Sequence, residues 1–267
     1  MVSLQSLSQA GKSIRLSQIL NSETKKAVIV AMDHGITRLR EGIEDIDITL
    51  KKVLYGEPDA IMINAGIAKR YFTYFMSKNA PGLILRVDGR RKPLVSVEDA
   101  LACGASAITA WLTLGLGEES ERYNLEYLSK YLQKCERFGM PLIAETIVFE
   151  KKANGEFVEK RDTESIKIAC RIASEIGCDL IKAPYVENMK EVVRCSSVPI
   201  LVLGGQKMET ELDVLKTVKE AINAGCIGCI IGRNVWQHKD PAGMIRALKK
   251  VIHEEADPEV ALKIIKH

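Results

Sequence analysis

The sequence lacks a long hydrophobic run, an excess of charge of one sign and a paired framework of cysteines. Met1 to Leu20 alternates apolar residues with Ser, Gln, Lys and Arg, unlike a signal peptide or membrane span. Its 38 basic and 35 acidic residues are dispersed and give a net charge of +3, which argues against nucleic-acid or membrane partners. We therefore expect a cytoplasmic protein, for which small anionic substrates remain possible.

Cysteine and histidine occur in numbers and places that argue against redox and metal chemistry. The seven cysteines are an odd number, mostly inside apolar segments, which favours reduced and buried thiols. Cys226 and Cys229 have C-x-x-C spacing without a second pair, so we prefer packing to a metal or redox role. With four histidines in the whole chain, ligands converging from several strand ends are not available. We expect neither a metal nor a cofactor.

What the chain does contain is a repeated pattern: an amphipathic stretch ends in glycine, and a short β-rich apolar run follows. The pattern occurs at Gly56, Gly104, Gly177 and Gly225, and other apolar runs begin after Pro or Gly. The predicted strands lie at 27–32, 60–63, 83–86, 105–110, 142–144, 180–182, 200–203 and 227–231. The predicted helices lie at 44–54, 66–78, 96–103, 119–138, 162–176, 187–195, 209–224 and 241–255.

This alternation predicts an α/β fold with a parallel sheet. Because no linker or composition shift divides the chain, we expect one (β/α)₈ TIM barrel as a single domain over residues 1–267, with a helical extension at about residues 1–20. The alternative is a doubly wound open sheet. Such a sheet usually carries a glycine-rich dinucleotide fingerprint after its first strand, whereas here Asp33-His34-Gly35-Ile36-Thr37 follows.

The carboxyl ends of barrel strands hold the chemistry, and one of them ends in a lysine. Lys182 closes an apolar run, where a charge is costly unless it has a function. Strand alternation places Lys182 and Leu180 on the inner face and Ile181 toward the helices. Lys182 is therefore a candidate nucleophile for carbonyl substrates, because a neutral amine can attack them. A nearby cation, Lys207 or Arg233, would favour the neutral form. The alternative is a lysine that reaches solvent or pairs with Asp179 or Glu187.

Three further turns at the carboxyl ends of predicted strands carry candidate site residues: two contain glycine, and one contains Asp33. Gly204-Gly205 and Gly232-Arg233 follow consecutive strands, where many barrels bind phosphate through backbone N–H groups and basic side chains. Plain tight turns are the alternative. Asp33 can shuttle protons beside a Schiff-base lysine, or can serve as a helix cap or turn residue. For His34 we favour substrate positioning or a structural hydrogen bond.

Four colinear segments resemble those of the archaeal-type class I fructose-bisphosphate aldolase family, among the DeoC/LacD-type aldolases. They are Met32-Asp33-His34-Gly35, Asp179-Leu180-Ile181-Lys182-Ala183-Pro184-Tyr185, Val202-Leu203-Gly204-Gly205 and Ile231-Gly232-Arg233-Asn234-Val235-Trp236-Gln237-His238. The family includes aminodideoxyheptulosonate synthase and autoinducer-2 phosphate thiolase. The resemblance covers nearly the whole chain.

The resemblance implies a Schiff base between Lys182 and a ketose phosphate, with Asp33 as proton acceptor. Substrate-lining and phosphate-holding residues would be His34, Gly35, Thr37, Gly204, Gly205, Gly232 and Arg233, and we add Glu145 and Lys207 from their places at strand ends. It also implies a homo-oligomer, since large assemblies such as decamers are common in the family.

Strands three and five depart from the family pattern. The family's strand five carries a proton-donating tyrosine, and this chain has Ile147 there; strand three ends in the charged stretch 86–91. Glu145, Tyr185 or a bound water are the candidate replacements. The predicted function is Schiff-base aldol, transaldol or thiolase-like chemistry, with a non-catalytic sugar-phosphate binder or an isomerase using Glu145 as base as alternatives. We expect residues 147–162 to form a loop, either a lid or an oligomer contact.

Overall fold

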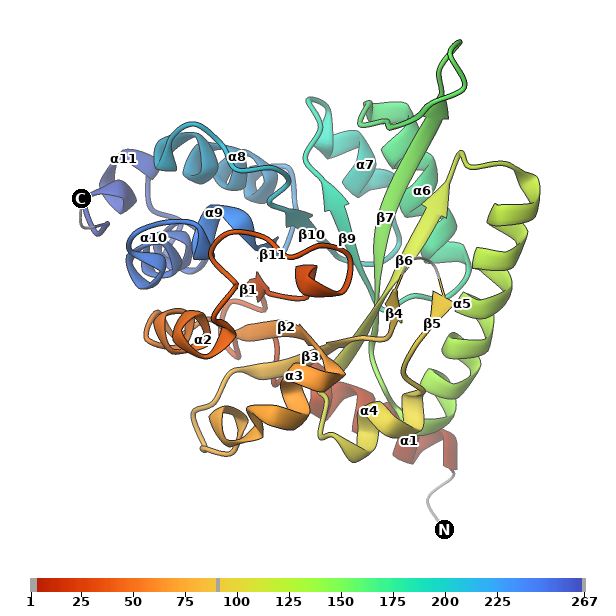
Figure 1. Cartoon of the computed structure of the whole chain (residues 1–267), viewed down its shortest axis with the longest axis horizontal. Coiled ribbons are helices and arrows are strands. Elements are labelled where there is room, and N and C mark those ends of the chain that lie inside the picture. Colours follow the sequence, from red (N-terminus) through yellow and green to blue (C-terminus); the bar gives the residue numbers. More distant parts are fainter. Residues whose placement is uncertain (1–3, 90–91, 266–267) are drawn as a thin grey trace.

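A closed ring of eight parallel strands forms the centre of the molecule (Figure 1). The structure is a computed structural model that describes residues 4–89 and 92–265. Around the ring the order is β6 (Ala107–Leu114), β3 (Gly82–Arg86), β2 (Ala60–Asn64), β1 (Ala27–Ala31), β11 (Gly228–Ile231), β10 (Ile200–Leu203), β9 (Leu180–Pro184) and β7 (Leu142–Lys151). Pairing of β7 with β6 closes the ring, which confirms the predicted (β/α)₈ barrel.

Helices follow the strands and surround the ring (Figure 1). They are α2 (Ile46–Leu54), α3 (Ala65–Arg70), α4 (Val97–Ala102), α5 (Glu118–Phe138), α6 (Thr163–Glu175), α7 (Met189–Cys195), α8 (Glu211–Asn223) and α10 (Pro241–His253). Shorter turns are η1 (His34–Ile36), η2 (Phe72–Phe75), α9 (Arg233–Trp236) and α11 (Pro258–Leu262). The single helix predicted at 66–78 is wrong, because Tyr71 leaves the helical conformation and α3 gives way to η2.

Alternating strand positions divide the core into an inner and an outer part. Leu180 belongs to the inner cluster and Ile181 to the cluster under the helices, as strand alternation predicted. Ile19, just beyond α1 (Leu4–Leu16), packs into the inner cluster and closes the amino-terminal end of the barrel. Lys12 of α1 forms an ion pair with Asp179 (2.9 Å) and anchors this closing segment.

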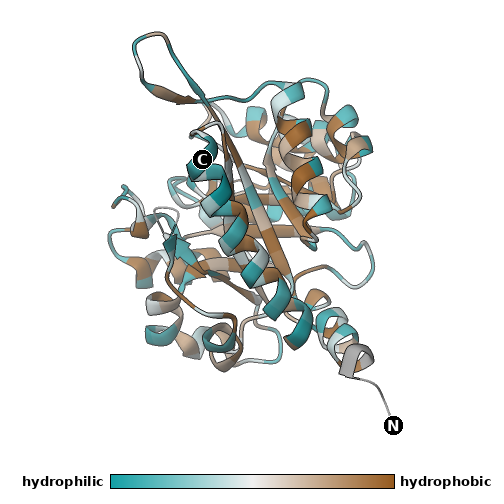
Figure 2. Cartoon of the chain, turned by 90° about the vertical axis from the view of Figure 1, so that its right-hand side faces the viewer, coloured by the Kyte–Doolittle hydropathy of each residue, from teal (hydrophilic) through white to brown (hydrophobic). Residues whose placement is uncertain are grey.

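The segment 147–162 is a hairpin instead of the expected loop. β7 continues to Lys151, the chain turns at Asn154-Gly155, and β8 (Phe157–Glu159) pairs back antiparallel on β7. Gly155 has φ of 85°, in the left-handed region that an Asn-Gly turn favours. The hairpin projects beyond the rest of the molecule (Figure 2) and carries Arg161 at its base.

A second, shorter antiparallel pair follows β3. It joins β4 (Asp88–Gly89) to β5 (Lys92–Pro93), while Arg90 and Arg91 of the charged stretch lie outside the described residues. Among the helices within the described ranges, none is long and apolar enough to cross a membrane.

Candidate active site

Lys182 lies inside the barrel and forms an ion pair with Glu145. The Nζ of Lys182 is 2.8 Å from Oε1 of Glu145, and only 5% of the lysine is exposed. The two residues are direct partners in the register of β9 and β7, so both side chains point to the same face of the sheet. The alternative in which Lys182 reaches solvent or pairs with Asp179 or Glu187 is therefore wrong.

Arg86, at the end of β3, joins three carboxylates beside this ion pair. Its Nε donates to Oδ2 of Asp33 (2.8 Å), and its Nη1 lies 3.3 Å from Oδ1 of Asp88. Its Nη2 donates to Oε2 of Glu145. The Arg86 side chain is 1% exposed. Lys182, Glu145, Arg86 and Asp33 thus form one continuous chain of charged hydrogen-bonding groups.

Arg86 and Lys182 keep the two acids of this network, Asp33 and Glu145, ionised. Burial alone would raise the pKa of Asp33, but the charges of Arg86 and Lys182 outweigh it and lower that pKa to about 2. At Glu145 burial opposes the same effect, and Lys182 and Arg86 lower the pKa below its usual value. Burial would lower the pKa of Arg86, but the surrounding carboxylates raise it. Both acids are therefore carboxylates at neutral pH, beside Arg86 and Lys182.

Asp88, the third carboxylate beside Arg86, is itself held in place by residues outside this group. Its Oδ2 accepts hydrogen bonds from the backbone N–H of Trp111 (2.8 Å) and from the hydroxyl of Tyr127 (2.7 Å). The Arg86 guanidinium lies 4.9 Å from the centroid of the Trp111 ring. Burial raises the pKa of Asp88 despite the nearby arginine. Sequence reasoning missed Trp111 and Tyr127, which no motif marks.

A hollow of about 170 Å³ opens beside Lys182 at the carboxyl ends of the strands. Of the predicted site residues, it is lined by His34, Glu145, Lys182, Gly204, Gly205, Gly232 and Arg233. Ile147 also lines it, so a hydrocarbon side chain stands where the resemblance implies a tyrosine. His34 sits with its Nδ1 3.6 Å from Oδ1 of Asp33, and burial followed by the charge of Lys182 lowers its pKa.

Other predicted residues point elsewhere. Gly35 is exposed and lines a separate hollow, and Thr37 is exposed with its Oγ1 donating to the carbonyl of His34 (3.0 Å). Lys207 donates from Nζ to the carbonyl of Gln237 (3.1 Å). Substrate roles for Gly35, Thr37 and Lys207 therefore stay predictions without support from their positions.

Tyr185 is also directed away from Lys182. Its hydroxyl donates to Oε2 of Glu220 (2.9 Å) in an exposed contact, and the residue does not line the hollow. Among the candidate replacements for the family tyrosine, Glu145 is the side chain that the structure places against Lys182.

The turn after β10 is held in a conformation that requires glycine. Gly205 has φ of 62°, and a Cβ on it would lie 3.1 Å from Nη1 of Arg161. Asn234 donates from Nδ2 to the carbonyls of Gly204 (2.9 Å) and Gln206 (3.0 Å). Asn234 therefore holds this turn through two hydrogen bonds, and the guanidinium of Arg161 from the hairpin lies close to it.

The turn after β11 is tied to the end of β1. A Cβ on Gly232 would lie 2.7 Å from the carbonyl oxygen of Ala31, so no larger residue fits. Trp236 donates from Nε1 to that same carbonyl (2.9 Å), and its ring meets His34 edge-on at 5.4 Å. The two turns and the segment after β1 therefore form one packed unit.

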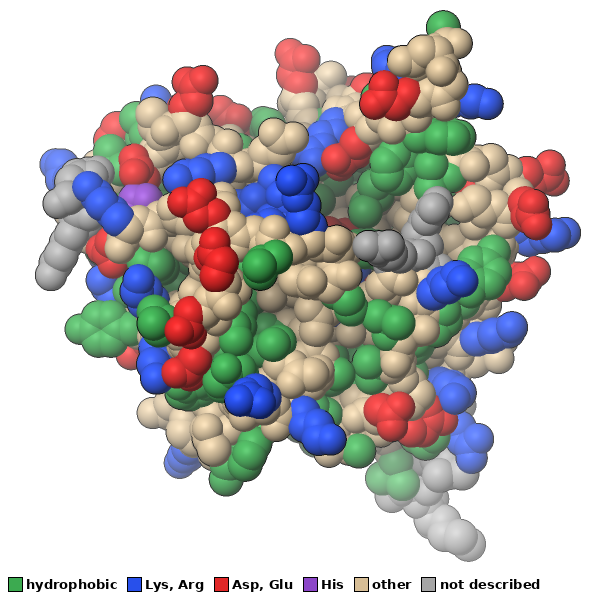
Figure 3. All heavy atoms as spheres, in the orientation of Figure 1, with side chains coloured by type: hydrophobic (Ala, Val, Ile, Leu, Met, Phe, Trp, Pro, Cys, Tyr) green, Lys and Arg blue, Asp and Glu red, His purple; other side chains and the backbone are tan. Residues whose placement is uncertain are grey.

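Three arginines converge on this unit. Burial, followed by the charges of Arg40 and Arg161, lowers the pKa of Arg233. The Nε atoms of Arg233 and Arg40 are buried without a hydrogen-bond partner. Figure 3 shows Lys and Arg side chains gathered in the upper centre of this face. Like charges with free donors suit a multiply charged anion such as phosphate. Sequence reasoning missed Arg40 and Arg161, because both are brought in by segments read as loops.

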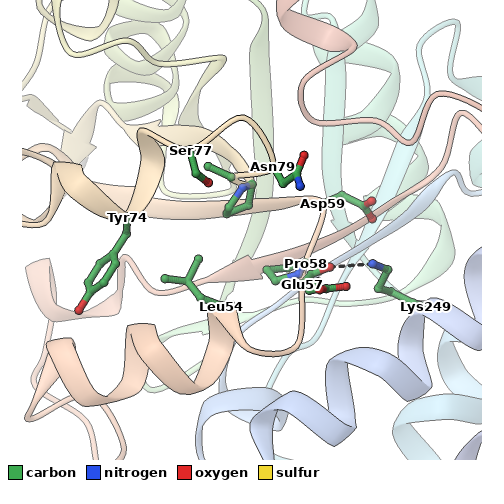
Figure 4. Close-up of a pocket in the computed structure, with 10 residues that line it drawn as sticks. Leu54, Glu57, Pro58, Asp59, Tyr74, Ser77, Asn79 and Lys249 are labelled. Atoms are coloured by element: carbon green, nitrogen blue, oxygen red, sulfur yellow. Dashed lines mark hydrogen bonds between the residues drawn. The ribbon is translucent and has the colours of Figure 1, made fainter.

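A larger hollow of about 630 Å³ lies at the amino-terminal ends of the strands (Figure 4). Two of its charged side chains are engaged by the protein itself: Lys249 donates to the carbonyl of Glu57 (2.8 Å), and Asp59 lies 2.9 Å from Nε2 of His253. Within the described ranges no group of three His, Cys, Asp or Glu residues is placed to hold a metal ion. We therefore assign the candidate site to the smaller hollow beside Lys182.

Comparison with known proteins identifies relatives over almost the whole length. Residues 27–238 match the family described as DeoC/LacD family aldolase. The chain is 33% identical to an uncharacterized aldolase of Saccharolobus solfataricus, over 96% of this chain and 99% of that protein. It is 30% identical to the 2-amino-3,7-dideoxy-D-threo-hept-6-ulosonate synthase of Halobacterium salinarum, over 96% and 97%. It is 31% identical to the 3-hydroxy-5-phosphonooxypentane-2,4-dione thiolase of Yersinia enterocolitica, over 96% and 87%.

Solved structures are similar over the same length. An archaeal fructose 1,6-bisphosphate aldolase matches with a TM-score of 0.78 at 28% identity, over 91% of this chain and 99% of that chain. A second structure of such an archaeal enzyme, with its catalytic lysine covalently bound to the carbinolamine intermediate of the substrate, matches with a TM-score of 0.77 at 27% identity, over 91% and 99%.

Proposed function

Because the chain belongs to the DeoC/LacD aldolase family, a family of enzymes, we propose that it makes or breaks a carbon–carbon bond through a Schiff base on Lys182. The proposed substrate is a phosphorylated carbonyl compound. The observation that carries the proposal is Lys182 itself, a buried amine at the carboxyl end of the barrel, in a hollow that also contains Arg233. The synthase and thiolase relatives support chemistry of this class.

The geometry supports a division of the hollow into a reacting end and an anion-binding end. Lys182 attacks the carbonyl carbon, and the resulting iminium withdraws electrons from the neighbouring bond, which can then break to leave an enamine. Arg233, with Arg40 and Arg161, supplies charge and donors for the phosphate. Asp33 as proton acceptor and a homo-oligomeric assembly remain predictions.

Borohydride reduction tests the proposal. The protein is incubated with fructose 1,6-bisphosphate or dihydroxyacetone phosphate and reduced, and its peptides are then mapped by mass. We expect a reduced adduct on Lys182 that is lost in Lys182→Ala and kept in Lys249→Ala, which changes a lysine at the opposite end of the barrel. No adduct on Lys182, or an unchanged adduct in Lys182→Ala, would overturn the proposal.

The alternatives give different results in the same samples. A non-catalytic binder would gain thermal stability with the two compounds by RT ln(1 + [L]/Kd), but would convert neither. An isomerase that uses Glu145 as base would keep its activity after Lys182→Ala. The adduct and its loss therefore separate the proposed enzyme from both.

A further inference from the structure

We propose that Glu145, rather than Asp33 or a tyrosine, exchanges protons with Lys182 as the Schiff base forms and hydrolyses. The inference rests on the proposed function, because it concerns the same lysine. Among the residues that the structure describes, Glu145 is the acid that forms an ion pair with Lys182, at 2.8 Å. That distance allows direct proton transfer without an intervening water.

The two oxygens of Glu145 have different partners, which suits a proton carrier. Oε2 accepts from Arg86, while Oε1 faces Lys182. A proton taken up on Oε1 therefore leaves the contact with Arg86 in place. Glu145 also lines the hollow, with 13% of its side chain exposed, so a carbonyl compound bound there can reach it.

Asp33 is placed less well for this role. Its Oδ2 is held by Nε of Arg86, and its Oδ1 lies 3.6 Å from Nδ1 of His34. Among the described residues Lys182 forms its ion pair with Glu145 and none with Asp33, so a proton would have to travel farther to reach Asp33.

The family's tyrosine position explains why another residue is needed. Ile147 lies two residues beyond Glu145 on β7, on the same face of the strand, and lines the same hollow. It has no proton to donate. Glu145 is the ionisable side chain on that face of β7 next to Lys182, and it takes over the proton transfer.

Protons and charges balance in this scheme. The Lys182 ammonium gives one proton to Glu145, and the neutral amine adds to the carbonyl carbon, which forms the carbinolamine. Glu145 passes its proton to the former carbonyl oxygen, then takes the second nitrogen proton and delivers that one too. Water leaves, the iminium keeps one N–H and a single positive charge, and Glu145 returns to the carboxylate. Hydrolysis is the reverse.

The pH dependence follows from the charged groups that surround Glu145. They are Arg86 from β3, Lys182 from β9, Asp33 and His34 after β1, the Glu159–Arg161 pair of the hairpin and Arg233 of α9. In wild type, the Lys182 proton has an internal acceptor at neutral pH. In Glu145→Gln it must go to solvent, so formation of the free amine depends on pH.

The test measures the rate of adduct formation on Lys182 with dihydroxyacetone phosphate, from neutral pH into the alkaline range. We expect Glu145→Gln to lower this rate at neutral pH by about 100-fold or more, the scale of general acid–base catalysis. The deficit should shrink as pH rises. Asp33→Asn, whatever its rate at neutral pH, should not show a deficit that shrinks as pH rises, and Glu150→Gln, on the same strand but outside the hollow, should change nothing.

Three results would overturn the inference while leaving Lys182 as the nucleophile. They are an unchanged rate in Glu145→Gln, an equal loss at every pH as a merely structural role would give, and a pH-dependent loss in Asp33→Asn in place of Glu145→Gln. A wild-type protein without any adduct on Lys182 would instead overturn the proposed function, and the inference with it.

Discussion

At the scale of single residues, Arg86 balances negative charges that the barrel would otherwise bury together. It contacts Asp33, Asp88 and Glu145, and its side chain is 1% exposed. A carboxylate without a partner in such surroundings is strongly unfavourable. Arg86 therefore compensates the charges of the three buried acids. Its burial leaves almost none of its side chain exposed to a substrate.

Arg86→Met keeps much of the side-chain volume and removes the charge. We expect it to lower the free energy of unfolding at neutral pH by about 3–5 kcal/mol, the cost of breaking a buried ion pair. Arg171→Met, which removes a surface pair with Glu175, should cost no more than about 1 kcal/mol. Urea unfolding measures both. Equal effects of the two changes would contradict this account.

The same acids give the prediction a pH signature. In wild type the Asp33 pKa is lowered from 3.8 to about 2, so its stabilising contribution is full above pH 3.8 and is lost as pH falls toward 2. In Arg86→Met burial is no longer opposed by this cation, so the Asp33 pKa should rise. The difference between variant and wild type should therefore shrink as pH falls.

At the scale of elements, the hairpin of β7 and β8 brings a basic side chain to the proposed anion-binding end of the hollow. It carries Arg161 to a position where its Nη1 would lie 3.1 Å from a Cβ on Gly205, and Arg161 also pairs with Glu159 (2.9 Å). Charge-assisted hydrogen bonds of this kind contribute about 1.5–3 kcal/mol. The hairpin is therefore expected to contribute to binding of the phosphorylated end of a substrate.

Arg161→Ala should raise the Kd for dihydroxyacetone phosphate about tenfold, which corresponds to about 1.4 kcal/mol. Its effect on adduct formation with unphosphorylated dihydroxyacetone should be small. Lys160→Ala, which removes a neighbouring positive charge paired with Asp162 at the surface, is the matched control. Equal losses for the two ligands would show that Arg161 does not bind the phosphate.

Elements also show what could be predicted from the sequence. Glycine caps and apolar runs were local signals, and they gave the strands, most helices and the inward direction of Lys182. The hairpin was missed because its charges were read as loop, although Asn154-Gly155 is a turn signal. Arg86 was noted only as a departure, because its partners Asp33 and Glu145 are 53 and 59 residues away and no local pattern reports them.

At the scale of the whole molecule, the barrel separates the end that carries the proposed active site from the end that α1 covers. Lys182 and the arginines lie at the carboxyl ends of the strands, while Lys12 joins α1 to Asp179 at the other end. Lys12 is 5% exposed, so its loss leaves Asp179 without its cation in a mostly buried place. Stability and chemistry should therefore respond to different substitutions.

Lys12→Met should lower the free energy of unfolding by about 3 kcal/mol. It should leave the rate of adduct formation on Lys182 unchanged at temperatures where the variant is folded. Lys134→Met, which removes the exposed pair with Glu98, should change neither quantity appreciably. Thermal unfolding and borohydride trapping on the same samples measure the two effects, and a slower adduct in folded Lys12→Met would count against the separation of the two ends.

The hydrogen bond from Trp236 to the Ala31 carbonyl has a consequence for selectivity. It joins α9, which carries Arg233, to the end of β1, which leads to Asp33 and His34. Because this hydrogen bond ties α9 to β1, and β1 is joined to β9 through the paired strands of the barrel, we expect the backbone spacing from Arg233 to Lys182 to change little when a ligand binds. On the proposed function, the protein should therefore select carbonyl compounds by their length, that is, by the number of bonds between the phosphate and the carbon that Lys182 attacks.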